Sequence, residues 1–242
     1  MKDKIKILHL FSKALDLYGD DGNLKALSFA LDKLNISCQI ESFEHWQELP
    51  PLSDYDLVYI GHGKAKNLIP CIKALQINKE NVLSYIENGG YFFCVGNSRE
   101  LFGKSFETPE GDSLEGLGLF DYVGKETMTV CVSDDLGEIN LGGRSIKTYG
   151  FVNRTAYLEG DAGESIFKLS RGLGDGKDAS AHEGTRYKNF FGSWQLGPFL
   201  ARNPEVLSYL IKKLTGLEEL SLDLSCEKLA LEATLKEFDS VK

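Results

Sequence analysis

The sequence predicts an α/β fold in which a mostly parallel central sheet is flanked by helices. Over the first hundred residues, apolar runs of strand length alternate with helical patterns, which is the order found in βαβ units. The run at residues 56–61 is continuously apolar and ends in glycine, as strands of a buried parallel sheet do. With 42% hydrophobic and 26% charged residues, the 242-residue chain can bury a sizeable core.

The first half of the chain supplies four strands and three helices. The strands are expected at residues 5–10, 37–43, 56–61 and 91–95. The helices are expected at residues 24–34, 67–75 and 79–87, the last of them stopped by a pair of glycines. We expect the strand at 91–95 to be central, with a tight turn over Gly96–Ser98 at its carboxyl end, where parallel sheets hold their ligands.

The second half is expected to add a β-rich segment instead of further βαβ units. Short runs broken by glycine and aspartate lie at residues 128–132, 145–149, 166–169 and 189–194. Asn203 and Pro204 have the residue types of an N-cap and first helical position, so a helix is expected to about Leu214. Residues 217–242 form a charged tail, interpreted as a final helix that docks on the body or on a partner.

The composition excludes several classes of function. A formal charge of −9 argues against nucleic acid or an anionic membrane surface as the main partner. The start of the chain has too short an apolar stretch for a signal peptide or a membrane span, so a cytoplasmic protein is expected. Five cysteines without a CxxC pair indicate free thiols, and four scattered histidines lack metal-ligand spacing. We expect no metal and no other cofactor.

Four segments carry a family resemblance. Residues 17–23 read LYGDDGN; residues 96–103 read GNSRELFG and are followed by TPEG at 108–111 and LEGLG at 114–118; residues 150–153 read GFVN; and residues 183–192 read EGTRYKNFFG, before Gly-Pro at 197–198 and Asn-Pro at 203–204. In this order they resemble class I glutamine amidotransferases of the cobyric acid synthase type, and most of all the glutaminase subunit of lipid II isoglutaminyl synthase. The resemblance implies a flavodoxin-like amidotransferase fold over residues 1–216, with 217–242 as the helical tail.

The chemistry of that family needs a cysteine on the turn between a strand and a helix, and a histidine that takes its proton. Where the family reads CGGYQLLG, this chain has Gly96 at the nucleophile position. Where the family reads TYLHGP, this chain reads SWQLGP and has Leu196 at the histidine position. No arginine lies between Leu119 and Gly143, although the family places one there to hold the glutamine carboxylate, and the family's GFENH run has become GFVNR at 150–154.

The resemblance therefore implies an amidotransferase fold that lacks the family's catalytic cysteine and histidine. The expected pocket is formed by Gly63, Gly96, Asn97, Ser98, Arg99, Glu100, Asn153 and Leu196. We expect it to be more apolar than a working glutaminase site, because Leu196 and Val152 replace polar residues there. The first hypothesis is a non-catalytic binding subunit whose partner, as in the family's active members, is an ATP-dependent Mur-ligase-like synthetase. Its small-molecule ligand, and the choice between a cell-wall and a cobalamin product, stay open.

The second hypothesis is an enzyme, either a glutaminase or another hydrolase, with a displaced nucleophile. Cys94 is one candidate, although it lies inside the expected strand, where a buried thiol is inert. Ser98 is another, but Leu196 removes the obvious base and a turn or capping role is expected. His62 replaces a glycine in the family's glycine-rich turn and would face the elbow, where it could pair with either nucleophile. Its alternative is a partly exposed loop histidine.

Overall fold

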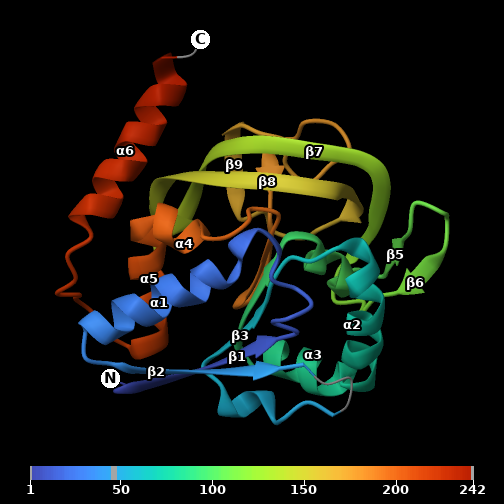
Figure 1. Ribbon diagram of the computed structural model, residues 1–242, viewed down its shortest axis with the longest axis horizontal. Coiled ribbons are helices and arrows are strands. Elements are labelled where there is room, and N and C mark those ends of the chain that lie inside the picture. Colours follow the sequence, from blue (N-terminus) through green and yellow to red (C-terminus); the bar gives the residue numbers. More distant parts are fainter. Residues whose placement is uncertain (1, 45–47, 241–242) are drawn as a thin grey trace.

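A computed structural model describes residues 2–44 and 48–240, and its strands form two sheets (Figure 1). The first sheet has six strands in the order β11 (Thr185–Tyr187), β12 (Phe190–Ser193), β4 (Tyr91–Val95), β3 (Leu57–Ile60), β1 (Lys4–Leu10) and β2 (Ser37–Phe43). All neighbours are parallel except β11 and β12. The expected parallel sheet with residues 91–95 near its centre is confirmed.

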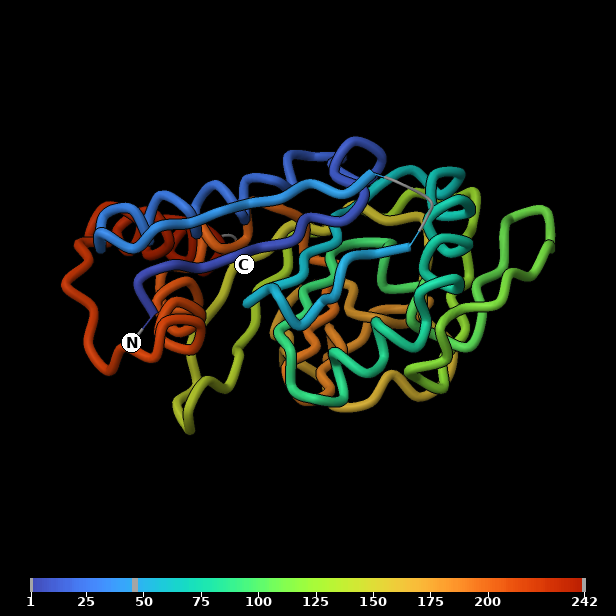
Figure 2. The backbone as a smooth tube through the Cα atoms, turned by 90° about the horizontal axis from the view of Figure 1, so that it is seen from below, coloured from blue at the N-terminus to red at the C-terminus, as the bar shows by residue number. Residues whose placement is uncertain are grey.

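Helices cover both faces of this sheet. One face packs against α1 (Asp21–Lys33), α4 (Phe199–Arg202) and α5 (Pro204–Thr215), and the other against α2 (Ala65–Ile77) and α3 (Lys79–Glu87). In Figure 2 the blue tubes of α1, β2 and β1 run side by side, and the teal coil of α2 lies at the right. Because strand residues alternate between faces, Phe92 and Cys94 join the α2 side, whereas Phe93 and Val95 join the α1 side.

The second sheet is built around one long hairpin. Its strands are β5 (Ser105–Glu107), β6 (Ser113–Glu115), β7 (Asp121–Leu141), β8 (Arg144–Asp161), β9 (Phe167–Arg171) and β10 (His182–Glu183). β7 and β8 arch across the top of Figure 1, and their antiparallel register shifts at a bulge between Glu126 and Cys131. The expected β-rich segment is present, but β7 and β8 are far longer than the short runs expected there, because glycine and aspartate inside these two strands do not end them.

Two local expectations are wrong. Residues 190–193 do not extend the additional sheet, because β12 pairs in parallel with β4 in the first sheet. Asn203 stands at the N-cap position before Pro204 and α5 runs to Thr215, as expected, but the Asn203 side chain does not cap the helix. Its Oδ1 accepts the Tyr149 N–H at 3.0 Å and its Nδ2 donates to the Tyr149 carbonyl at 2.8 Å. The amide therefore ties the start of α5 to β8. It pairs the backbone N–H and carbonyl of a residue inside the strand instead of an N–H at the helix end.

The chain ends its described part in helix α6 (Ser225–Ser240), which has no buried residue and projects from the body in Figure 1. The ring of Phe238 lies 5.8 Å from that of Tyr149, and the Arg171 guanidinium lies 4.9 Å from the Phe238 ring centre. Three 3₁₀ helices complete the fold: η1 (Leu17–Gly19), η2 (Leu52–Asp54) and η3 (Gly96–Phe102). Among the described residues, the helices lack the length and apolar character needed to cross a membrane.

Candidate functional site

The elbow of the fold is the point where β4 passes into η3 at the carboxyl edge of the first sheet. Gly96 has a φ of +67°, a conformation that glycine adopts without strain, and Gly96–Phe102 is buried throughout. The expected tight turn over Gly96–Ser98 is instead the first part of a 3₁₀ helix that follows β4 directly. Cys94 lies inside β4 as expected, so the strand register is kept.

His62 fills the space where a side chain at position 96 would lie. A Cβ built on Gly96 would be 2.2 Å from His62 Nδ1 and 2.6 Å from its Cβ, closer than real atoms approach. The imidazole is buried, and the Tyr18 ring stacks on it with centroids 5.5 Å apart. His62 thus faces the elbow as expected, but it is not a partly exposed loop histidine. A side chain at position 96 and the His62 ring therefore compete for one space.

The protonation state of His62 follows from its partners. Its Nδ1 accepts the backbone N–H of Asn97 at 3.1 Å, so in the neutral ring the proton is on Nε2. Burial lowers the pKa of His62 to about 4. At neutral pH the imidazole is therefore uncharged and acts as a hydrogen-bond acceptor beneath the elbow.

Backbone donors of the elbow are occupied by side chains of the same chain. The N–H of Asn97, the residue after the family's nucleophile position, is held by His62. The N–H of Gly63 donates to Asn97 Oδ1 at 3.1 Å, and Asn97 Nδ2 donates back to the Gly63 carbonyl at 2.7 Å. An oxyanion hole needs backbone donors that point at open space, and these two point at neighbouring side chains.

Asp20 joins the elbow loop to the strand end that would carry the family's histidine. Its carboxylate accepts the N–H of Gly197 at 2.6 Å and the N–H of His62. Burial is the main cause that raises the pKa of Asp20 to about 7. Leu196, next to this contact, is fully buried among the side chains of the α1 side, and its N–H donates to the Phe151 carbonyl at 2.8 Å. No proton-accepting side chain stands at this position.

The two displaced-nucleophile candidates are buried together. Cys94 Sγ lies 3.1 Å from Ser98 Oγ, which in turn donates to the Val95 carbonyl at 2.8 Å. Burial raises the pKa of the Cys94 thiol to about 12. Both side chains are almost inaccessible to solvent, and His62 is engaged by Asn97. Ser98 therefore has the turn role that its position predicts.

Arg99 holds the elbow to the β10–β11 region through a buried ionic cluster. Its guanidinium donates to Asp175 at 2.5 Å and to Thr185 at 2.6 Å, and lies 3.4 Å from Glu183. Glu183 also accepts the Trp194 N–H at 2.6 Å. The buried Glu183 and the partly buried Asp175 together compensate the charge of the guanidinium, so the cluster positions the strand end after β12.

Glu100 is a second buried charge-bearing group of the elbow. Burial, and after it the nearby Glu126 carboxylate, raise the pKa of Glu100 well above its usual range. A Cβ on Gly124 would lie 2.7 Å from Glu100 Cγ, so glycine is required opposite it. Arg154 is buried in the same region, where its guanidinium lies 5.3 Å from the Trp194 ring centre. Buried polar groups thus predominate on this side of the elbow, whereas Leu196 and Val152, on which the expectation of an apolar pocket rests, are buried on its other sides.

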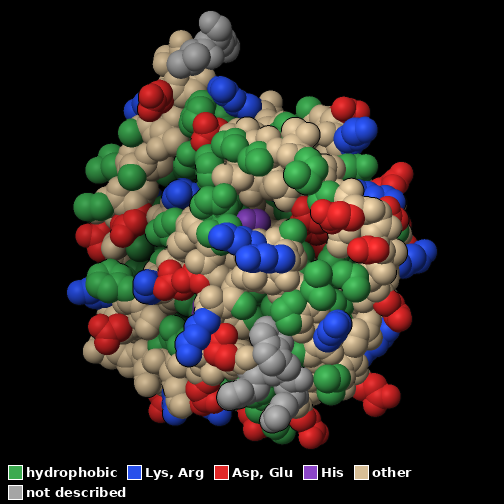
Figure 3. Space-filling view, turned by 45° about the vertical axis from the view of Figure 1, so that its right-hand side comes forward, with side chains coloured by type: hydrophobic (Ala, Val, Ile, Leu, Met, Phe, Trp, Pro, Cys, Tyr) green, Lys and Arg blue, Asp and Glu red, His purple; other side chains and the backbone are tan. Residues whose placement is uncertain are grey.

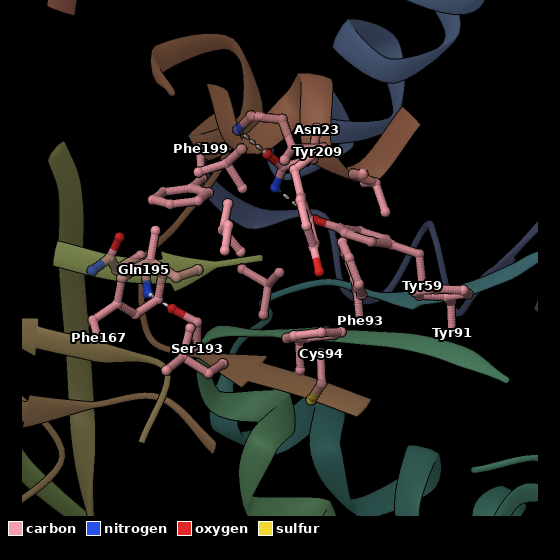
Figure 4. A pocket seen from close by; sticks show the side chains of 18 of the residues that line it. Asn23, Tyr59, Tyr91, Phe93, Cys94, Phe167, Ser193, Gln195, Phe199 and Tyr209 are labelled. Carbon is pink, nitrogen blue, oxygen red and sulfur yellow. Dashed lines mark hydrogen bonds between the residues drawn. The ribbon is translucent and has the colours of Figure 1, made fainter. Parts of the chain in front are cut away.

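The remaining expected residues lie apart from this cluster or only frame it. Gly63 approaches Leu15 so closely that a Cβ would lie 2.3 Å from its side chain. Asn153 is on the half-buried face of β8, whereas Val152 and Arg154 point to the core side. An apolar cavity does exist, but it lies on the opposite face of β4 (Figure 4).

The sequence alone predicts no role for several residues that the structure brings into the site. Asp20 lies in the LYGDDGN run, and a buried role could have been suspected because the acidic pair is flanked by glycines. Glu183 opens the EGTRYKNFFG run, but nothing in the sequence pairs it with Arg99 or places Asp175 beside them. His182 lies in β10 and is exposed. On the face in Figure 3, Lys and Arg side chains are interspersed with Asp and Glu side chains.

Comparisons with known proteins agree with this architecture. Residues 6–204 match the CobB/CobQ-like glutamine amidotransferase domain. The GatD subunit of lipid II isoglutaminyl synthase (glutamine-hydrolyzing) from Staphylococcus aureus strain N315 is 27% identical over 237 residues, covering 98% of this chain and 90% of that protein. The subunit of the same name from Streptococcus pneumoniae strain ATCC BAA-255 / R6 is 26% identical over 212 residues, covering 86% and 79%.

Solved structures give the same result for the fold. PurLQS from Thermotoga maritima has a TM-score of 0.51 at 13% identity and covers 97% of this chain and 100% of that chain. A glutamine amidotransferase from the same organism has a TM-score of 0.54 at 12% identity and covers 96% and 91%. The glutamine amidotransferase fold expected from the sequence is confirmed.

Proposed function

Because the chain belongs to the CobB/CobQ-like glutamine amidotransferase family, we propose that it is a member that has lost glutaminase activity and acts as a binding or regulatory subunit. The observation that carries the proposal is the position of His62. Its ring occupies the space of a nucleophile at position 96 and takes the Asn97 N–H. A single side chain therefore blocks both the nucleophile position and a donor of the oxyanion hole.

The alternative, an amidotransferase or other hydrolase that uses Cys94 or Ser98, has less support. A thiol with a pKa of about 12 contributes almost no thiolate at neutral pH. Ser98 is committed to the Val95 carbonyl, and the position that would supply a base is Leu196. Activity through either residue would require the β4–η3 junction to open.

The partner in this proposal is an ATP-dependent Mur-ligase-like synthetase. The two relatives are named as subunits of a glutamine-hydrolyzing lipid II isoglutaminyl synthase. A subunit that has lost its catalytic activity would be retained for its place in such an assembly. A surface on β7 supports docking, because the bulge before Cys131 exposes Met128, Val130 and Val132. We propose that residues 1–216 form the docking body, that 217–242 form a separate tail, and that the complex is cytoplasmic.

A coupled ammonia assay tests the loss of activity. We expect no glutamine hydrolysis by the purified protein, alone or with the synthetase. The pair Gly96→Cys and Leu196→His should also stay inactive, because His62 still occupies the site. Adding His62→Gly should give the first measurable, though low, turnover, because substrate positioning and the other donors are still missing. Turnover by the unmodified protein that disappears in Cys94→Ala would overturn the proposal in favour of the displaced-thiol enzyme.

Co-purification with the synthetase tests the docking surface. Val130→Lys places a charge in the exposed apolar row and should abolish the complex. Ile77→Lys on α2 is the matched control, since Ile77 is likewise apolar and 68% exposed, and it should leave the complex intact. Equal binding by both variants would exclude the β7 surface.

A further inference from the structure

An apolar cavity of about 100 Å³ lies on the face of the first sheet that α4 and α5 cover, opposite to η3 (Figure 4). It is enclosed by aromatic and aliphatic side chains of the sheet and of the helices above it. Those used in the argument are Tyr91 and Phe93 from β4, Phe191 from β12, and Val206, Tyr209 and Lys213 from α5. The cavity is separate from the elbow, so an inference about it does not depend on whether catalysis is lost.

Three polar side chains of its wall, those of Asn23, Cys94 and Gln195, are held by other groups or turned away from the cavity. Asn23 donates to the Tyr59 hydroxyl at 3.0 Å and accepts the Leu200 N–H at 2.9 Å. Figure 4 shows the sulfur of Cys94 turned away from the cavity. The Gln195 amide lies toward β8, where a Cβ on Gly150 would be 2.2 Å from its Oε1. The interior therefore presents mainly carbon surface, which favours an apolar group over a polar one.

Charge at the edge of the cavity is positive. Lys213 is the charged residue among those that line it, and its Nζ lies 5.2 Å from the Tyr209 ring centre. Arg186 lies 5.6 Å from the Phe191 ring centre, although Glu164 is 3.7 Å from its guanidinium. A cation beside an apolar hole, in a chain of net charge −9, favours a ligand with an anionic head and an apolar tail.

We propose that this cavity binds a small amphipathic carboxylate, with its hydrocarbon tail between the β4–β12 floor and α5 and its carboxylate at Lys213. An apolar cavity of about 150 Å³ holds benzene, so about 100 Å³ holds about four of the five tail carbons of hexanoate, with the fifth at the edge beside the carboxylate. Aromatic walls on both sides exclude water from the tail, while the exposed lysine keeps its cation solvated at the edge.

Titration of the ¹⁵N-labelled protein, followed by amide chemical shifts, tests the assignment. Hexanoate should shift the amides of residues 91–95, 191–195 and 206–213. Acetate, which lacks the tail, and hexylamine, which carries the opposite charge, should bind at least about threefold more weakly, because each loses one of the two interactions. Hexanoate shifts confined to other regions, or equal binding of hexanoate and hexylamine, would overturn the proposal.

Two variants separate the two interactions. Lys213→Glu should weaken hexanoate by about three- to tenfold and favour hexylamine, whereas Lys212→Glu changes the net charge equally and should leave both unchanged, since Lys212 is outside the lining. Val206→Phe fills the cavity and should abolish hexanoate binding, with thermal unfolding used to check that the variant is folded. Unchanged hexanoate affinity in the Lys213 variant would contradict the proposed carboxylate position, and unchanged affinity in a folded Val206→Phe would contradict the cavity as the site.

Discussion

The elbow and helix α6 are attached to the same body in opposite ways. Every residue of η3 is buried, and its neighbours His62 and Asp20 link the ends of β3 and β4 to the strand end at Gly197. Helix α6 has no buried residue and contacts the body along α4 and β8, where the Phe238 ring lies beside Tyr149. The comparison shows that the elbow is tightly packed: its space is filled and its backbone donors are paired. Helix α6, by contrast, is attached through partly exposed side chains.

Removing the carboxylate of Asp20 should give the largest loss of stability. Asp20→Ala leaves the N–H groups of His62 and Gly197 without an acceptor, and the expected destabilisation is about 3–5 kcal/mol. The measurement is urea unfolding at constant pH. The control is Asp21→Ala, which loses a surface pair with Lys25 and should cost less than about 1 kcal/mol. Similar losses for both variants would show that the elbow is not held by this carboxylate.

Gly96→Cys should cost about 2–4 kcal/mol, because it forces a side chain at positive φ into the His62 ring. His62→Gly should recover the steric part, so the double-mutant cycle should give a coupling of about 1–3 kcal/mol. Denaturant unfolding of the four proteins measures it. Additive effects would mean that the two positions do not share one space.

Two opposing titrations should nearly cancel between pH 4 and 6.5. Asp20 has a folded-state pKa of about 7, raised by burial, so the folded state binds more protons there and stability falls as pH rises. His62 has a folded-state pKa of about 4, lowered by burial, so the unfolded state binds more protons and stability rises with pH.

Variants should reveal each contribution by itself. As the pH rises from 4.5 to 6.5, the stability of Asp20→Asn should increase by about 2–3 kcal/mol relative to that of the unmodified protein, because the variant lacks the Asp20 titration. Over the same range the stability of His62→Gln should decrease by a similar amount relative to the unmodified protein. Urea unfolding at both pH values gives the two differences. A difference that does not change with pH would remove that residue from the account.

Truncation after Leu224 should give the smallest effect. It removes α6, which buries no residue, and should change the free energy of unfolding by less than about 1 kcal/mol. Truncation after Gly216 also removes Leu224, which packs on the α1 side, and should cost more. A loss above about 2 kcal/mol on removing α6 alone would contradict the weak attachment seen in the structure.

The strands and helices of the first hundred residues could be predicted from the sequence because their periodicity reflects burial on two faces. Helix α3 and strand β2 match the expected bounds, as apolar spacing and glycine stops indicate. The long hairpin could not be predicted as such. Its strands continue through Gly124 and Gly137, where the facing side chain or strand leaves no room for a Cβ, so these glycines serve packing instead of turns.

The site was predictable at the level of which residues surround the elbow, but not how they pair. The resemblance brought Gly96, Asn97 and His62 to one place, and the structure agrees. Pairing depends on contacts between distant segments, such as Asp20 with Gly197 or Arg99 with Asp175. Neither periodicity nor local propensity carries information on such contacts, so Asp175 in its glycine-rich loop had no signal.

The bulge of β7 also gives the protein a built-in spectroscopic probe. The chain has two methionines, Met1 and Met128, and Met128 is 85% exposed at one end of the apolar row on β7. Labelling the methionine methyl carbons with ¹³C would therefore produce one internal resonance in the entire protein. A flexible, exposed methyl group gives a sharp signal that broadens and shifts on contact with a large partner. Occupation of this surface could thus be followed residue-specifically without any substitution in the chain.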